Sequence, residues 1–143
     1  MFLEKFRVDG KIAIITGGTR GIGLSIAHAL GEAGAKLVLT NRTDQFGGLE
    51  SLKKAKYDVS FFEGDLLDKS IPQKTIDYTL EKHGRVDILV NNAGIAKHGE
   101  MEDYNDDFLD SIMDINVDAV FRMCRSVITP MKKQGEGTIL NIG

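Results

Sequence analysis

Short apolar runs alternate with longer segments of helical periodicity along the whole chain. The apolar runs predict strands over residues 11–15, 36–40, 59–62, 86–90 and 138–141. Their near-continuous apolar character is typical of strands buried on both faces of a parallel sheet. The segments between them are long enough to form crossover helices. The pattern therefore predicts an α/β fold, with a single domain over 1–143 built as a doubly wound parallel sheet of five strands.

The intervening helices are expected over 22–33, 46–55, 70–83 and 107–133. Gly34 can cap the first helix, and Ser70 is a candidate N-cap of the third, with Pro72 in its first turn. The longest helix has two apolar faces, one made of Leu109, Ile112, Met113, Val120, Met123 and Val127 and the other of Val117, Phe121, Cys124 and Ile128. One face can pack on the sheet. The other needs a different partner, either the rest of the domain or another subunit.

Composition narrows the class of protein. The chain is 42% hydrophobic and 27% charged, with a formal charge of −3, which is typical of one soluble globular domain without a nucleic-acid surface. Its apolar runs are too short for a membrane span, and its first residues lack the apolar core of a signal peptide, which favours the cytoplasm. Cys124, the one cysteine, lies in a helical pattern and is interpreted as a buried small hydrophobe. No His, Cys and carboxylate cluster has metal-ligand spacing, so no metal is expected.

A glycine-rich segment, Thr16-Gly17-Gly18-Thr19-Arg20-Gly21-Ile22-Gly23, directly follows the first apolar run. A strand that runs into such a turn and then a helix is the geometry that binds the phosphates of a dinucleotide. Gly17 allows the sharp turn, Gly21 leaves room for the pyrophosphate, and Gly23 allows close packing of the helix. The free N–H groups of the first helical turn would then face the anion.

The end of the second predicted strand bears on the choice of cofactor. A site for NAD usually has an acidic residue there, which holds the ribose 2′-hydroxyl. This chain has Asn41 at that point and Arg42 just beyond it, and Arg20 in the glycine turn could add a second positive charge. An arginine suits the oxygens of a 2′-phosphate, so the sequence favours NADP(H) over NAD(H). Asp44 nearby argues in the other direction.

The Thr-Gly-x-x-x-Gly-x-Gly spacing differs from the usual Gly-x-Gly-x-x-Gly and resembles the short-chain dehydrogenase/reductase family. Three further segments are similar to that family in the same order, and they are Asp87-Ile88-Leu89-Val90-Asn91-Asn92-Ala93-Gly94, Ile115-Asn116-Val117-Asp118-Ala119-Val120-Phe121 and Gly137-Thr138-Ile139-Leu140-Asn141-Ile142-Gly143. The resemblance spans nearly the whole chain and implies a Rossmann-like fold that is truncated after its fifth strand. It also implies reversible hydride transfer between a nicotinamide cofactor and a carbonyl or alcohol.

The resemblance also assigns residues to roles. It implies that Gly17, Thr19, Arg20, Gly21, Ile22, Gly23, Asn41, Arg42, Asp65, Leu66, Asn92, Ala93 and Gly94 contact the cofactor. Asn116 matches the asparagine that holds a water in the proton relay of the family. The serine and the Tyr-x-x-x-Lys pair of the family would follow Gly143, so residues 1–143 alone are expected to be inactive. Tyr78 and Lys82 have the bare spacing but precede the fourth strand, and they are interpreted as a surface pair.

The resemblance further implies a small carbonyl or alcohol substrate and a homodimer or homotetramer formed through the helix Asp107–Lys133. The segments Phe6-Arg7-Val8-Asp9-Gly10-Lys11 and Asn116-Val117-Asp118-Ala119-Val120-Phe121 are similar to those of sugar- and polyol-linked members. A 3-oxoacyl thioester reductase is the alternative within the family. A non-catalytic nucleotide-binding protein on the same fold is the alternative outside it, because fold does not fix function.

Overall fold

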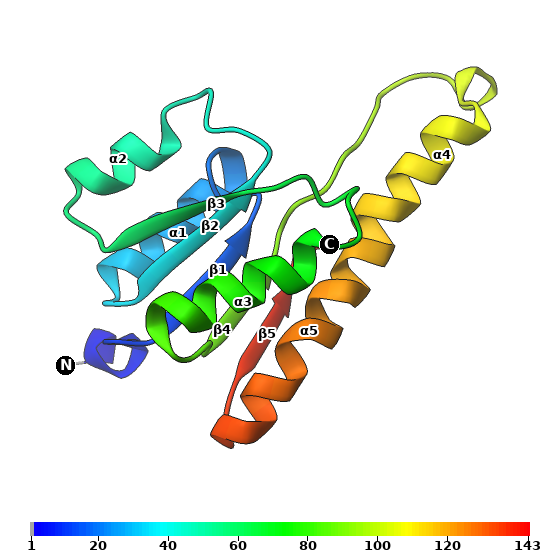
Figure 1. The fold of residues 1–143 in the computed structure, drawn as a ribbon. Helices are drawn as coiled ribbons and strands as arrows, with labels where there is room; N and C mark the ends of the chain where they lie inside the picture. The colour runs from blue at the N-terminus through cyan, green and yellow to red at the C-terminus, as the bar shows by residue number, and fades with distance from the viewer. Residues whose placement is uncertain (1) are drawn as a thin grey trace.

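The computed structural model describes residues 2–143 and is built around one parallel sheet (Figure 1). The strands are β1 Ile12–Thr16, β2 Lys36–Asn41, β3 Val59–Glu63, β4 Ile88–Asn91 and β5 Thr138–Asn141. They lie in the order β3-β2-β1-β4-β5, and every pairing is parallel. The predicted Rossmann-like α/β fold is confirmed. The order reverses between β1 and β4, and doubly wound sheets bind ligands at such a switch point.

Helices cover both faces of the sheet because alternate residues of each strand point to opposite sides. On one face, α1 Gly21–Glu32 and α2 Gly48–Lys54 pack on a cluster that includes Ala13, Ile15, Leu37 and Leu39. On the other face, α3 Ile71–His83 and α5 Ala119–Gln134 pack on a cluster that includes Ile12, Ile14 and Val38. This arrangement explains why the strands are apolar throughout rather than alternating with polar residues.

The third helix is capped differently from the prediction. Ser70 precedes α3, but its side chain makes no capping hydrogen bond to the helix. Its hydroxyl instead donates to Asp68 Oδ1 at 2.7 Å, in a turn just before the helix. Ser70 therefore occupies the predicted N-cap position, but its side chain does not cap the helix, since its backbone is already helical and its hydroxyl oxygen accepts no helix N–H. The prediction for the first helix holds: Gly34 follows the carboxyl end of α1 and has φ +102, in the left-handed region that favours glycine.

The longest helix is not regular. Helix α4 Asp106–Met113 and α5 are joined by a π-helical turn, Asp114–Asp118, and together they form one long rod (Figure 1). A π turn holds one residue more than an α turn needs, so it rotates the following helix by about 100° relative to a continuous α-helix. The predicted grouping of Leu109 and Met113 with Met123 and Val127 is therefore wrong, since the first two are exposed and the last two are buried.

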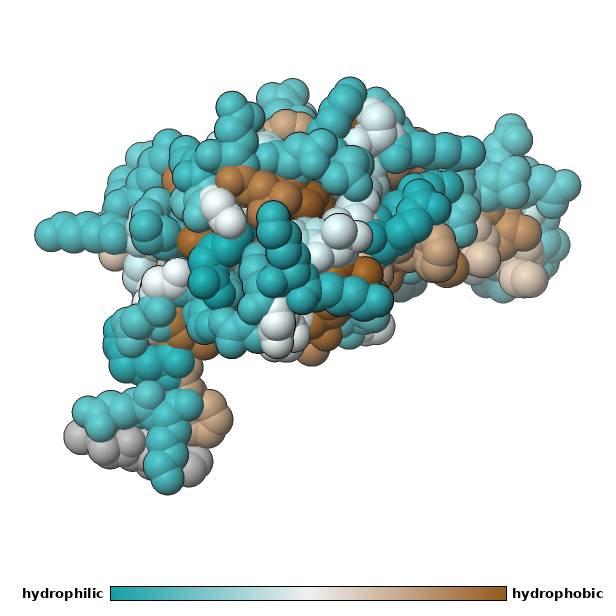
Figure 2. Space-filling view, turned by 60° about the horizontal axis from the view of Figure 1, so that its bottom comes forward, coloured by the Kyte–Doolittle hydropathy of each residue, from teal (hydrophilic) through white to brown (hydrophobic). Residues whose placement is uncertain are grey.

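The exposed apolar residues of this rod form one stripe instead. Leu109, Met113, Val117 and Phe121 follow one another at intervals of four residues, and Ile128 continues the series. We call these five residues the α4–α5 stripe. Apolar side chains are visible along the lobe where α4 extends beyond the sheet (Figure 2). The face that packs on the sheet consists of Ala119, Met123, Val127 and Met131.

A network of ion pairs closes the amino-terminal edge of the sheet. The Asp87 carboxylate, 4% exposed, accepts hydrogen bonds from Arg85 Nε at 2.9 Å and from the Ile12 N–H at 2.9 Å. Glu136, which precedes β5, lies 2.6 Å from Lys11 Nζ and 2.9 Å from Arg85 Nη2. Burial alone would raise the pKa of Asp87, but the hydrogen bonds from Arg85 and Ile12 outweigh it and the pKa is lowered. We call Lys11, Arg85, Asp87 and Glu136 the amino-edge network.

Candidate functional site

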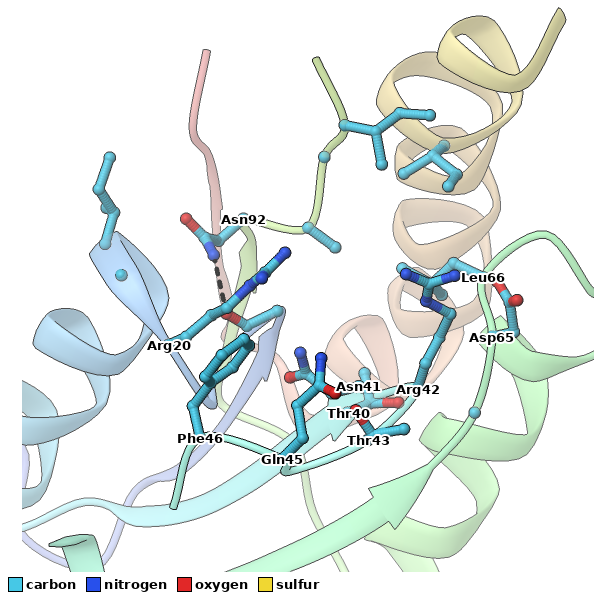
Figure 3. Close-up of a pocket in the computed structure, with 18 residues that line it drawn as sticks. Arg20, Thr40, Asn41, Arg42, Thr43, Gln45, Phe46, Asp65, Leu66 and Asn92 are labelled. Atoms are coloured by element: carbon cyan, nitrogen blue, oxygen red, sulfur yellow. Dashed lines mark hydrogen bonds between the residues drawn. The ribbon is translucent and has the colours of Figure 1, made fainter. Parts of the chain in front are cut away.

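A cavity of about 380 Å³ lies at the carboxyl ends of β1, β2, β3 and β4 (Figure 3). The loops that follow these strands supply most of its wall, as expected for an open parallel sheet. Of the predicted site residues, it is lined by Gly17, Arg20, Gly21, Ile22, Asn41, Arg42, Asp65, Leu66, Asn92, Ala93 and Gly94. The fold thus brings into one cavity predicted residues that are up to 77 positions apart in the sequence, from Gly17 to Gly94.

The glycine turn forms the part of the wall between β1 and α1. Gly17 and Gly21 have φ +66 and +55, in the left-handed region that favours glycine. A Cβ added at Gly21 would meet nothing within 4 Å, so the space beside this backbone is open. A Cβ at Gly23 would lie 2.2 Å from the Gly17 carbonyl oxygen and 2.4 Å from Asn92 Nδ2. The missing side chain at Gly23 therefore allows α1 to pack against the turn and Asn92, whereas the missing side chain at Gly21 leaves open space beside the backbone.

The segment after β4 is bonded to the glycine turn. Asn92 Nδ2 donates to the carbonyl oxygens of Thr16 and Gly17, at 3.2 and 3.1 Å. The Thr16 hydroxyl oxygen in turn accepts from the N–H groups of Asn92 and Ala93, at 3.0 and 2.9 Å. The Asn92 side chain thus fixes the shape of the cavity, and its amide nitrogen is already engaged with the protein.

Thr19 and Gly23 lie beneath the cavity and do not line it. The Thr19 N–H donates to Asn41 Oδ1 at 3.3 Å, which bonds the glycine turn to the end of β2. The Thr19 carbonyl oxygen would lie 2.0 Å from a Cβ at Gly48, the first residue of α2. Gly48 therefore lets α2 approach the glycine turn, a role that the sequence analysis missed.

Two arginines stand at the mouth of the cavity. Arg20 and Arg42 come from the glycine turn and the end of β2, and both are exposed (Figure 3). Within residues 2–143, neither guanidinium has a carboxylate partner among the ion pairs of the structure. The Arg20 guanidinium lies over the Phe46 ring, 5.4 Å from its centroid.

Asp44, which argued against a phosphate at this site, does not line the cavity. Its carboxylate accepts hydrogen bonds from the Gly48 N–H at 2.9 Å and from the Leu49 N–H at 3.2 Å. Asp44 therefore caps α2, where the free N–H groups of a helix favour a negative charge. This cap also explains why α2 begins at Gly48 rather than at Phe46 as predicted, and it leaves Phe46 in the loop.

The opposite wall is made by the loop after β3. Leu66 is 8% exposed and packs with the core under α3 and α5, and Ile115 is a second apolar residue that lines the cavity. Asp65 Oδ1 accepts from the Leu67 N–H at 3.0 Å, which holds the loop in a turn. This wall offers an apolar surface to a flat ring such as a nucleobase.

Asn116 lies in the π turn and does not line the cavity. Its side chain pairs with the backbone of Ile95, since Nδ2 donates to the Ile95 carbonyl oxygen and Oδ1 accepts from the Ile95 N–H, both at 2.8 Å. Asn116 thus bonds the long helix to the loop after β4. Ile95 itself lines the cavity, so this pair connects the asparagine to the wall.

Tyr78 and Lys82 lie on α3, outside the cavity. Lys82 Nζ is 5.9 Å from the centroid of the Tyr78 ring, which also packs against Phe62. The two residues form a surface pair, as interpreted from their place before β4. Within residues 2–143 no group of three or more His, Cys, Asp or Glu is arranged to hold a metal ion. None of the helices described there is long and apolar enough to cross a membrane.

The sequence analysis also missed residues that line the cavity, namely Thr40, Thr43, Gln45, Phe46, Gly64, Ile95 and Ile115. Three of them, Thr40, Thr43 and Gly64, lie at the end of a strand or within two residues of it, and that place at the carboxyl ends of the strands could have indicated them. Phe46 had no such signal, because it was assigned to a helix.

Comparison with known proteins gives a consistent result. The family model of the short chain dehydrogenases matches residues 11–143. The NADP-dependent (R)-specific alcohol dehydrogenase of Lentilactobacillus kefiri is 40% identical over 138 residues, which are 95% of this chain and 55% of that protein. The crystal structure of gox2181 superposes with a TM-score of 0.93 at 36% identity and covers 100% of this chain and 57% of that one.

A gluconate 5-dehydrogenase from Burkholderia cenocepacia, solved in complex with NADP and tartrate, has a TM-score of 0.87 at 34% identity. The match covers 99% of this chain and 56% of that structure. The chain therefore spans about half the length of the curated relatives it matches. With the glycine turn, the strand order and the family match in agreement, the chain belongs to the short-chain dehydrogenase/reductase family.

Proposed function

We propose that the chain is the cofactor-binding part of an NADP(H)-preferring oxidoreductase that interconverts carbonyls and alcohols. The observation that carries the proposal is a pair of arginines, without carboxylate partners among the described residues, at the mouth of a cavity built on a glycine turn. Two similar proteins support it, since one is named as NADP-dependent and the other was solved with NADP.

The cavity fits the adenosine and pyrophosphate parts of a dinucleotide. The open space beside Gly21 and the N–H groups at the start of α1 suit the pyrophosphate. Leu66 and Ile115 offer an apolar wall for the adenine, and Arg20 and Arg42 suit a 2′-phosphate. Asn41 adds no negative charge to oppose that phosphate.

The chemistry of such an enzyme has two parts. The bound nicotinamide supplies or accepts the hydride. The protein orients the carbonyl and delivers a proton, a task that the family resemblance assigns to a serine, a Tyr-x-x-x-Lys pair and Asn116. No Tyr-x-x-x-Lys pair faces the cavity among the described residues, because Tyr57 and Tyr104 have a phenylalanine four positions later and Tyr78 with Lys82 lies on α3 outside it. Asn116 would act from the π turn, through the backbone that its side chain holds in place.

Substrate and assembly extend the proposal. Sugar- or polyol-like carbonyl compounds are the favoured substrates, in line with the similarity to the gluconate 5-dehydrogenase. The α4–α5 stripe is an apolar surface of the kind that subunit interfaces bury, and we propose that a homodimer or homotetramer forms through it, in the cytoplasm.

The test is direct. The full-length protein is titrated with NADPH and NADH, and reduction of a panel of sugar ketones and 3-oxoacyl thioesters is followed by NADPH oxidation. Tighter binding of NADPH with turnover of a sugar ketone is expected. Equal affinities would refute the cofactor preference. Binding without turnover of any carbonyl compound would favour a non-catalytic nucleotide-binding protein.

A further inference from the structure

Among the described residues, three of the six arginines pair with a carboxylate, whereas Arg20 and Arg125 lie against aromatic rings. Arg7, Arg85 and Arg122 each pair with a carboxylate. Arg20 lies against an aromatic ring and has no such pair among the described residues. The distinction matters because a carboxylate occupies the N–H groups of a guanidinium, whereas a ring contacts its flat face.

The ring is that of Phe46, which is 64% exposed. The loop that carries Phe46 is anchored on both sides. The Asp44 carboxylate bonds the loop to α2 on one side, and the Thr19 hydroxyl donates to the Thr43 carbonyl oxygen at 3.4 Å on the other. Phe46 therefore projects from an anchored loop and lies beside Arg20 at the cavity (Figure 3).

The arrangement leaves the donors of Arg20 available. Its guanidinium carries five N–H groups in a fixed plane, and stacking on a ring uses none of them. An exposed arginine held by nothing would lose side-chain freedom when it bound an anion, and this loss would weaken the binding. A carboxylate would remove that loss, but it would compete with the anion for the same N–H groups.

We propose that Phe46 is a positioning residue that sets the preference for a phosphorylated adenosine by holding Arg20 at the mouth of the cavity. With Arg42 on the other side, a phosphate on the 2′-oxygen of the adenosine meets two cations, one of which is already held in place. This inference rests on the proposed NADP(H) function. Beyond that function, it assigns Phe46 an indirect role, in which the ring contacts Arg20 and Arg20 contacts the phosphate.

The probes are 2′,5′-ADP and 5′-AMP, which differ by the 2′-phosphate alone. Phe46→Leu removes the ring and keeps an apolar side chain, so it should weaken 2′,5′-ADP binding about two- to fivefold, the range of an exposed cation–π contact. Binding of 5′-AMP should not change. Phe46→Tyr keeps the ring and should keep the affinity of the unmodified protein. Because Phe46 is exposed, each variant should keep its thermal midpoint, which is measured in parallel.

A double-mutant cycle separates positioning from direct contact. Arg20→Met keeps the length of the side chain and removes its charge. In that background Phe46→Leu should have no further effect on 2′,5′-ADP, because Phe46 acts through Arg20. An equal loss for 5′-AMP and 2′,5′-ADP, or an unchanged effect of Phe46→Leu in the Arg20→Met background, would overturn the proposal and make Phe46 a contact of the adenosine.

The failure of this inference differs from that of the proposed function. If the unmodified protein binds 2′,5′-ADP no more tightly than 5′-AMP, the NADP(H) preference is wrong and the role of Phe46 falls with it. If the preference exists and depends on Arg20 and Arg42 but not on Phe46, only the positioning role is overturned.

Discussion

Positive side chains have different partners at the two ends of the parallel strands, which form the amino-terminal and carboxyl-terminal edges of the sheet. At the amino-terminal edge, Lys11 and Arg85 are paired with Asp87 and Glu136. At the carboxyl-terminal edge, Arg20 and Arg42 face a cavity and have no carboxylate partner among the described residues. A buried paired charge such as Asp87 is satisfied within the fold and contributes to its stability, while an unpaired charge is available to a ligand. The comparison separates residues that hold the sheet together from residues that bind.

The largest effect is expected at Asn116. Asn116→Ala in the full-length protein should lower turnover on the order of 100-fold, the low end for a positioned proton-transfer group. Cofactor affinity should change much less, because the side chain does not line the cavity. The measurement is steady-state reduction with cofactor affinity determined separately. Asn105→Ala is the control, since Asn105 caps α4 through the Phe108 N–H but contacts no cavity residue. Normal turnover of the Asn116 variant would leave the Ile95 pair a structural contact only.

A somewhat smaller effect is expected at Arg42. Arg42→Asp should weaken NADPH binding about 10- to 100-fold, the equivalent of losing a hydrogen bond to a charged group, and should abolish or reverse the preference over NADH. Lys36→Asp makes the same change of charge at the amino end of β2. The length of β2 separates Lys36 from Arg42 by about 20 Å, which is beyond the range of a screened charge. The ratio of NADPH affinity to NADH affinity should therefore not change. An equal response to both changes would mean that net charge, not the site, sets the preference.

Substitutions in the amino-edge network should change the free energy of unfolding rather than cofactor binding. Asp87→Asn should lower the free energy of unfolding by about 1.5–3 kcal/mol, because it breaks hydrogen bonds between a buried carboxylate and a guanidinium. The ratio of NADPH to NADH affinity should stay as it is. Urea denaturation gives the first quantity and cofactor titration the second. Asp9→Asn, the same change at an exposed pair with Arg7, should have no measurable effect on stability. A shift in cofactor preference in the Asp87 variant would break the separation of the two edges.

The smallest effect is the pH dependence of the same network. The pKa of Asp87 is lowered in the fold, and the pKa of Glu136 is lowered by its hydrogen bond from Lys11. The unfolded chain therefore binds more protons in acid, and the stability from these groups is present above their unfolded pKa values of about 4 and lost as the pH falls through the folded ones. Unfolding midpoints between pH 6 and 3 should fall less steeply for Asp87→Asn than for the unmodified protein. Parallel curves would show that the lowered pKa of Asp87 contributes nothing.

The sequence was sufficient for the elements and the place of the site, because both depend on local patterns. Apolar runs predict the five strands, and the glycine turn marks the strand–turn–helix unit. What the sequence could not show depends on contacts between distant residues. The start of α2 is set by the cap from Asp44 and the approach of Gly48 to Thr19, and neither can be read from periodicity. Phe46 therefore went unrecognised as a neighbour of Arg20.

The π turn at Asp114–Asp118 makes the register of the long helix depend on a single residue. A deletion of one residue there would convert the turn to α-helix and rotate α4 by about 100° relative to α5. Every contact of α5 with the sheet could survive, yet Leu109 and Met113 would no longer be aligned with Val117 and Phe121. The extra residue thus works as a rotational offset between the part of the rod anchored on the sheet and the part that extends beyond it. In this chain a one-residue change in length, without any change in the core, would reshape an entire exposed surface.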